Sequence, residues 1–173
     1  MRFLRPVMAF QAFCDQQTDG GGWTLVWSYT FTTYSSFNTG ANEVTPRPTW
    51  TASSAITRVS TTAPLSETHY EAMNFDLWRT IGNQTLIKSN INNWIACKEG
   101  TGSIVREKAG SVSCKLVKQG SQQCAGVEPT RLLKGSAGPY HISPPVVCII
   151  TLKRIRVVVG PRVTRAAKTK QIS

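Results

Sequence analysis

The chain of 173 residues is long enough for one domain with a substantial core, and its 40% hydrophobic and 17% charged residues are values typical of globular proteins. The formal net charge is +11, yet residues 1–130 carry 11 Lys and Arg against all nine acidic residues, while residues 131–173 carry nine Lys and Arg and no acid. This distribution argues against a basic nucleic-acid-binding face on the first 130 residues, and no apolar run reaches the roughly 20 residues that a membrane-spanning helix needs.

Residues 1–9 form an N-terminal segment in which positive charge is followed by apolar residues. This order is that of a short secretory signal, although Arg5 and Pro6 interrupt it. The sequence leaves two interpretations open: a signal peptide, or a gene start that lies upstream.

The strongest local pattern is a turn followed by a strand. Asp19 and Gly20 suit the two positive-φ positions of a tight hairpin turn. Trp23, Leu25 and Trp27 then recur with a period of two, as along one face of a strand. The pattern predicts a β-hairpin whose tryptophan face is buried.

A long loop and then a helix are expected next. Residues 28–66 are rich in Ser and Thr and contain three prolines, which predicts an irregular surface loop. Ser66 can cap a helix, and Gly82 can end it. Between them an apolar stripe at helical spacing predicts an amphipathic helix whose stripe belongs to the core: Tyr70, Met73, Leu77, Trp78 and Ile81.

Beyond the helix the sequence predicts short strands separated by turns. Asn83 opens an N-glycosylation sequon, Asn-Gln-Thr, in the turn that follows the helix. Apolar runs predict strands at residues 86–88 and 94–97, with further extended pieces at 103–106 and 113–117. After residue 130 the acids and tryptophans end, which predicts an irregular basic tail, disordered or aberrant. A genuine tail and a frame or exon error both fit this break.

Four cysteines are disulfide candidates: Cys14, Cys97, Cys114 and Cys124; the odd one, Cys148, lies in the tail. No CxxC pair is present and neither histidine has zinc-finger spacing, so no structural metal site is expected. Disulfides in an oxidising compartment fit the wide spacing, and buried free thiols are the alternative. The short polar loop between Cys114 and Cys124 favours that pair.

The segment from Cys14 to Val26 resembles the opening of the fibrinogen C-terminal domain family, which reads Cys-Asp-(Met/Gln)-x-Thr-Asp-Gly-Gly-Gly-Trp-Thr-(Leu/Val)-(Ile/Val). Eleven residues match by position: Cys14, Asp15, Thr18, Asp19, Gly20, Gly21, Gly22, Trp23, Thr24, Leu25 and Val26. A weaker resemblance covers the stretch from Phe75 to Asn83. The Ser/Thr-rich insert and Asn90–Trp94 look like the divergent invertebrate branch that includes cnidarian skeletal-matrix proteins. The resemblance extends over residues 10–130.

This resemblance implies a lectin-type recognition domain of which only the opening portion is present. Members of the family bind acetylated sugars or peptide knobs through a later subdomain with an Asp-rich calcium loop. After Glu128 this chain has no acid, so no calcium loop and no metal or other cofactor are expected. The early disulfide of the family joins the first cysteine to one shortly after it, whereas the next cysteine after Cys14 is Cys97.

Catalytic patterns are missing from the sequence. His69 and His141 lie in a helical and a Pro/Gly-rich context, without a nucleophile motif beside them. Glu67 and Glu71, one helical turn apart, suit a solvated face. No catalytic constellation can be assembled, so we do not expect an enzyme.

We therefore expect an α+β protein: an N-terminal β-hairpin and a small antiparallel sheet packed on one amphipathic helix, in an incomplete fibrinogen-C-terminal-like domain over residues 10–130. A basic tail, residues 131–173, follows. The expected function is that of a secreted, extracellular, non-enzymatic recognition or matrix protein with a protein or carbohydrate ligand. The alternative is binding of polyanions, such as nucleic acid, anionic lipid or acidic matrix proteins, through the tail.

Overall fold

The computed structural model describes residues 10–30, 46–51, 58–90, 93–120, 128–135, 138–142, 149–151 and 156–160, with the backbone alone described from residue 134 onward. These residues contain nine strands, one α-helix and one 3-10 helix, in the order β1 (Cys14–Asp15), η1 (Thr18–Gly20), β2 (Trp23–Trp27), α1 (Phe75–Ile81), β3 (Gln84–Lys88), β4 (Trp94–Glu99), β5 (Gly110–Lys118), β6 (Arg131–Gly135), β7 (Gly138–Ile142), β8 (Ile149–Thr151) and β9 (Arg156–Gly160). One helix combined with antiparallel sheets confirms the α+β class.

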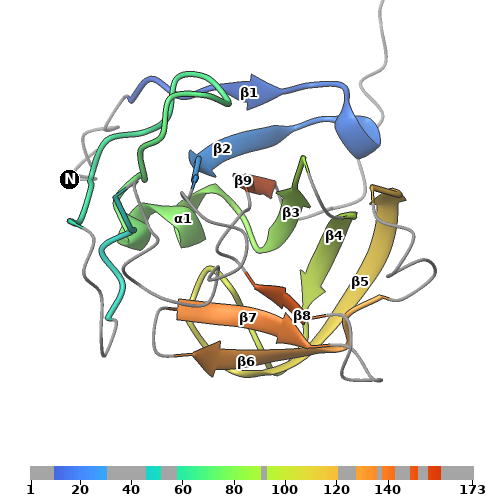
Figure 1. The fold of residues 1–173 in the computed structure, drawn as a ribbon. Coiled ribbons are helices and arrows are strands. Elements are labelled where there is room, and N and C mark those ends of the chain that lie inside the picture. Colours follow the sequence, from blue (N-terminus) through green and yellow to red (C-terminus); the bar gives the residue numbers. More distant parts are fainter. Residues whose placement is uncertain are drawn as a thin grey trace, which may run out of the picture.

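The strands form two antiparallel sheets that share β5. The first has the order β1-β2-β9-β3-β4-β5, and the second continues from β5 through β6 and β7 to β8. Most of β5 pairs with β4, while its first residues, Gly110 and Ser111, pair with β6. In Figure 1, β6 and β7 lie across the lower ends of β4 and β5. The long β5 therefore joins the two sheets.

The first sheet is covered on both faces. In β3, the adjacent residues Leu86 and Ile87 are both fully buried, and they belong to two different apolar clusters. Ile87 faces the larger cluster, which includes Trp78 of α1. Leu86 faces a smaller cluster with Trp23 and Leu25 of β2. The sheet thus carries an apolar cluster on each face, with the helix on the side of Ile87 and Phe13 packed on the side of Leu86.

The helix is shorter than the sequence predicts, because the residues before it pair with β2. The Met73 amide donates to the Val26 carbonyl at 2.8 Å, and the Ser28 amide donates to the Glu71 carbonyl at 3.0 Å. Asn74 caps the helix in place of Ser66, with its side chain accepting from the Asp76 amide. The expected end at Gly82 and the burial of Trp78 are confirmed.

The hairpin is present, but its loop is longer than a two-residue turn. Asp19 and Gly20 have φ of 49° and 86°, as expected. The whole loop spans residues 16–22, and a Cβ on Gly21 would lie 2.3 Å from the Gln16 carbonyl oxygen. The burial of the tryptophans in β2 is confirmed.

The expected alternation along β2 breaks near its end. A register shift against β9 between Leu25 and Trp27 places Val26 and Trp27 in the same cluster. There, Trp27, Trp50, Phe75 and Trp78 pack edge to face, with ring centroids of contacting pairs 5.1–5.8 Å apart. Such pairs stabilise a core beyond their buried area. The Ser/Thr-rich loop therefore returns to the core at Trp50.

Two further expectations differ from the structure. The described part of the tail forms β6 to β9, so the prediction of an irregular tail is wrong for those residues, and β9 pairs with both β2 and β3. Residues 103–106 form a turn closed by a bridge between Ser103 and Lys108, because their amides bond to each other's carbonyls. The strands expected at 86–88, 94–97 and 113–117 are confirmed as β3, β4 and β5.

Among the described residues, no helix is long and apolar enough to cross a membrane.

Candidate functional site

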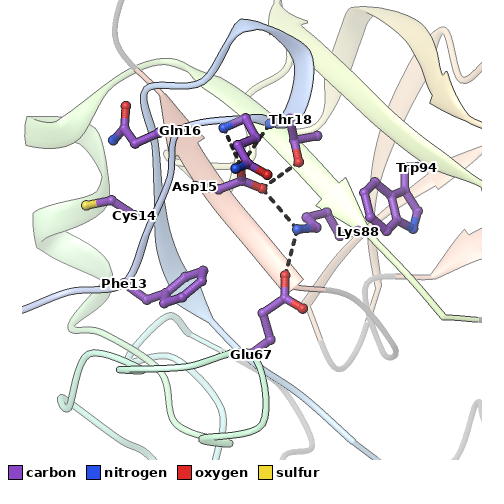
Figure 2. A pocket seen from close by; sticks show the side chains of 9 residues that line it. Phe13, Cys14, Asp15, Gln16, Thr18, Glu67, Lys88 and Trp94 are labelled. Carbon is purple, nitrogen blue, oxygen red and sulfur yellow. Dashed lines mark hydrogen bonds and ion pairs between the residues drawn. The ribbon is translucent and has the colours of Figure 1, made fainter.

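A groove of about 600 Å³ lies between the loop after β1 and the ends of β3 and β4. Figure 2 shows its charged groups converging on the ammonium of Lys88, with the Trp94 ring beside them. The lining residues come from four separate segments: Phe13, Cys14, Asp15, Gln16, Gln17, Thr18, Glu67, Lys88 and Trp94.

Lys88 is the centre of the groove. It follows Leu86 by two residues in β3, so its side chain lies on the same sheet face as the smaller apolar cluster. Only 9% of that side chain is exposed. Its Nζ donates to Asp15 Oδ2 at 3.0 Å and to Glu67 Oε1 at 2.6 Å. A nearly buried ammonium requires such partners, since desolvation of an unpaired charge is costly.

Asp15 holds the loop that forms one wall of the groove. Its Oδ1 accepts from the amides of Gln17 and Thr18, and its Oδ2 accepts from the Thr18 hydroxyl at 2.6 Å as well as from Lys88. Burial raises the pKa of Asp15, but the hydrogen bonds from the Thr18 hydroxyl, the two amides and Lys88 outweigh it and place the pKa well below its usual range. Asp15 is therefore ionised at neutral pH.

Glu67 forms the opposite wall. It belongs to the turn at residues 65–69, in which the His69 amide donates to the Ser66 hydroxyl and the Leu65 amide donates to His69 Nδ1. The Ser28 hydroxyl donates to the Glu67 carbonyl at 2.5 Å and ties this turn to the end of β2. The Glu67 side chain is 32% exposed, so it faces both Lys88 and solvent.

Trp94 closes the groove on the side of β4. Its Nε1 donates to the Ser89 carbonyl at 2.6 Å, which fixes the ring. Lys88 Nζ and Lys118 Nζ each lie 4.7 Å from the ring centroid, within the range of cation–π attraction. The ring therefore lies between a nearly buried lysine of β3 and an exposed lysine of β5.

The sequence prediction did not identify Lys88 and Trp94 as site residues. A signal for Lys88 was available: it takes the next same-face position after the buried Leu86, and a charge in such a position requires a counter-charge. Nothing in the sequence pointed to Asp15 and Glu67 as that counter-charge, because both lie far from Lys88 in the chain. The second acid of the same loop, Asp19, pairs with Lys115 at 2.6 Å instead of with Lys88.

The cysteine candidates are placed as follows. Cys97 and Cys114 face each other across β4 and β5 and form a disulfide. The favoured Cys114–Cys124 pair is therefore wrong, because strand pairing brings Cys97 within bonding distance of Cys114. Cys14 is an exposed free thiol at the groove, and Cys124 and Cys148 lie outside the described residues.

The sequon residue Asn83 lies between α1 and β3 with a half-buried side chain, and its glycosylation stays a prediction. His141 lies in β7, where only the backbone is described. Within the described ranges, no three His, Cys, Asp or Glu side chains gather as a metal site would need. The groove can offer a ligand hydrogen bonds, the aromatic rings of Phe13 and Trp94, and charges of both signs.

In comparisons with known proteins, no family model, no curated protein and no solved structure matches this chain.

Proposed function

We propose that this protein is a secreted, non-enzymatic recognition or matrix protein with a partial fibrinogen-like, lectin-type domain, and that its groove takes part of an extracellular carbohydrate or protein ligand. The observation that carries the proposal is the way Lys88 joins Asp15 and Glu67. These bonds fix three segments of the chain before any ligand arrives. A pre-organised site loses less conformational entropy on binding.

The groove favours binding over catalysis. Asp15 already accepts four hydrogen bonds, so its carboxylate is poorly placed to take up a proton. Lys88 Nζ already donates to two carboxylates, so it is poorly placed to attack a ligand as a nucleophile. The Nδ1 atom of His69 is used within its own turn. These groups are suited to holding shape and hydrogen-bonding a ligand.

The Cys97–Cys114 disulfide supports the extracellular part of the proposal, because disulfides persist in oxidising compartments. The eleven-residue match to the fibrinogen C-terminal opening supports the family. The alternative of polyanion binding through the tail stays a prediction, because Arg131 is the one basic residue of the tail whose side chain lies within the described residues.

The test uses protein secreted by a eukaryotic cell line and a panel of immobilised glycans and matrix proteins. We expect saturable binding that Glu67→Gln and Trp94→Phe weaken. Glu67→Gln keeps the side-chain shape and removes the charge, whereas Trp94→Phe keeps an aromatic ring of smaller area; both residues line the groove. The exposed Arg79→Gln on α1, away from the groove, is the matched control. Retention of reduced protein in the cell, or binding that both groove variants leave unchanged, contradicts the proposal.

A further inference from the structure

A row of exposed lysines runs along β4 and β5 beside the groove. In this antiparallel pair, Trp94 lies opposite Lys118, Ala96 opposite Lys115, and Lys98 opposite Ser113. Residues that face each other across two strands project from the same face, so the three lysines share a face with Trp94. All three lysines are exposed. From Lys118 to Lys98 the row covers four residues along β4, about 13 Å at the usual rise per residue.

Two of these lysines have no ion-pair partner among the described carboxylates. Lys115 pairs with Asp19, whereas no described acid lies within ion-pair distance of Lys98 or Lys118. The face therefore offers two uncompensated ammonium groups at its ends, with a lysine in an exposed, weakly held pair between them.

Trp94 connects this face to the groove. Lys118 lies over its ring, but the lysine is exposed and can turn toward an anionic group of a ligand. That movement would free one side of the indole for the apolar face of a sugar ring. Glu67, which lines the groove, would then accept hydrogen bonds from the neutral hydroxyls of the sugar. The anionic groups of the ligand would lie on the lysine side, away from this carboxylate.

We propose that the β4–β5 face binds a linear polysaccharide that carries sulfate or carboxylate groups, with one sugar ring against Trp94 and its anionic groups on Lys118, Lys115 and Lys98. This inference rests on the proposed extracellular function and names the ligand class of the groove together with the β4–β5 face beside it. The arrangement favours a polysaccharide over a nucleic acid. Single-stranded nucleic acids bind by stacking successive bases on several aromatic rings, and among the described residues this face has one.

The first experiment is a heteronuclear NMR titration of the full chain with a sulfated heparin-type tetrasaccharide. We expect saturable shifts at the Trp94 indole N–H and at the amides of β4 and β5 around the three lysines. A desulfated tetrasaccharide gives much smaller shifts. Shifts confined to residues 131–173 overturn the inference and assign the binding to the basic tail.

The second experiment compares two double variants with the same change in charge. Lys98→Gln with Lys118→Gln removes the two unpaired lysines, and Arg79→Gln with Lys108→Gln removes two exposed cations elsewhere. We expect the first pair to weaken tetrasaccharide binding about three- to tenfold, the range for two exposed ion pairs, and the second to leave it nearly unchanged.

Equal weakening by both double variants overturns the inference, because it indicates a response to net charge alone. Binding of a thymidine oligonucleotide as tight as that of the tetrasaccharide also overturns it, in favour of a nucleic-acid ligand. If the protein binds neutral glycans through Glu67 and Trp94 but not the sulfated tetrasaccharide, the proposed function stands and only this inference fails.

Discussion

Replacing Lys88 with methionine removes a nearly buried ammonium while keeping most of the side-chain volume. The change deletes hydrogen bonds to two carboxylates, each of the kind that contributes about 1.5–3 kcal/mol. Part of that loss is offset, because burying the ammonium itself is unfavourable. Asp15 keeps three other donors, and the partly exposed Glu67 can be hydrated. We expect the free energy of unfolding to fall by about 2–3 kcal/mol.

Urea unfolding followed by tryptophan fluorescence measures this loss. The matched control is Lys98→Met in the neighbouring strand, which is exposed and has no ion pair with a described carboxylate; we expect it to change stability by less than about 0.5 kcal/mol. In a double-mutant cycle, Asp15→Asn and Lys88→Met should show a coupling energy of about 0.5–3 kcal/mol. A Lys88→Met protein as stable as the wild type would refute the reasoning that the ammonium organises the groove.

Four further predictions concern the core, the cysteines, acid and calcium. Trp23→Ala should lower the free energy of unfolding by about 3–5 kcal/mol, since the ring is 5% exposed; wild-type thermal stability would contradict this. Alkylation without reductant, read by mass spectrometry, should label Cys14 and spare Cys97 and Cys114; labelling of all three would exclude the disulfide. Because folding lowers the pKa of Asp15, its contribution is complete above its unfolded pKa of about 3.9 and is lost as the pH falls further. The acid limb of a urea-stability profile should therefore be less steep in Asp15→Asn, and an unchanged limb would contradict this. Calorimetry with millimolar calcium and acetylated sugars should show no chelator-sensitive binding, because the acids are scattered; saturable binding would contradict this.

Local features of the fold could be predicted from the sequence where side-chain chemistry decides them. Asp19 and Gly20 adopt positive φ because they tolerate it, and the strands β3 to β5 follow their apolar runs. The start of the helix could not be predicted in the same way. The stripe from Tyr70 to Met73 has helical spacing, but pairing with β2 takes up its backbone groups. Tertiary pairing overrides local propensity there.

Long-range relations account for the other errors. The groove exists because Asp15, Glu67 and Lys88 meet across distant parts of the chain, and period or composition cannot report such a meeting. The same holds for Cys97 and Cys114, whose partnership follows from strand register rather than from loop length. The local sequence feature that pointed to the site was Lys88, a charged residue at a strand position where burial is expected.

The central position of β9 has a consequence for biogenesis. Thr24 pairs with Val159, so two strands from opposite ends of the chain must meet before the sheet is continuous. Such distant contacts slow folding, since closing a long loop costs entropy before the pairing compensates for it. During synthesis from the N-terminus, β2 and β3 emerge early and expose open edges until residues 156–160 leave the ribosome. Unpaired edges recruit strands from other chains. Late arrival of β9 therefore lengthens the time during which these edges are open to association.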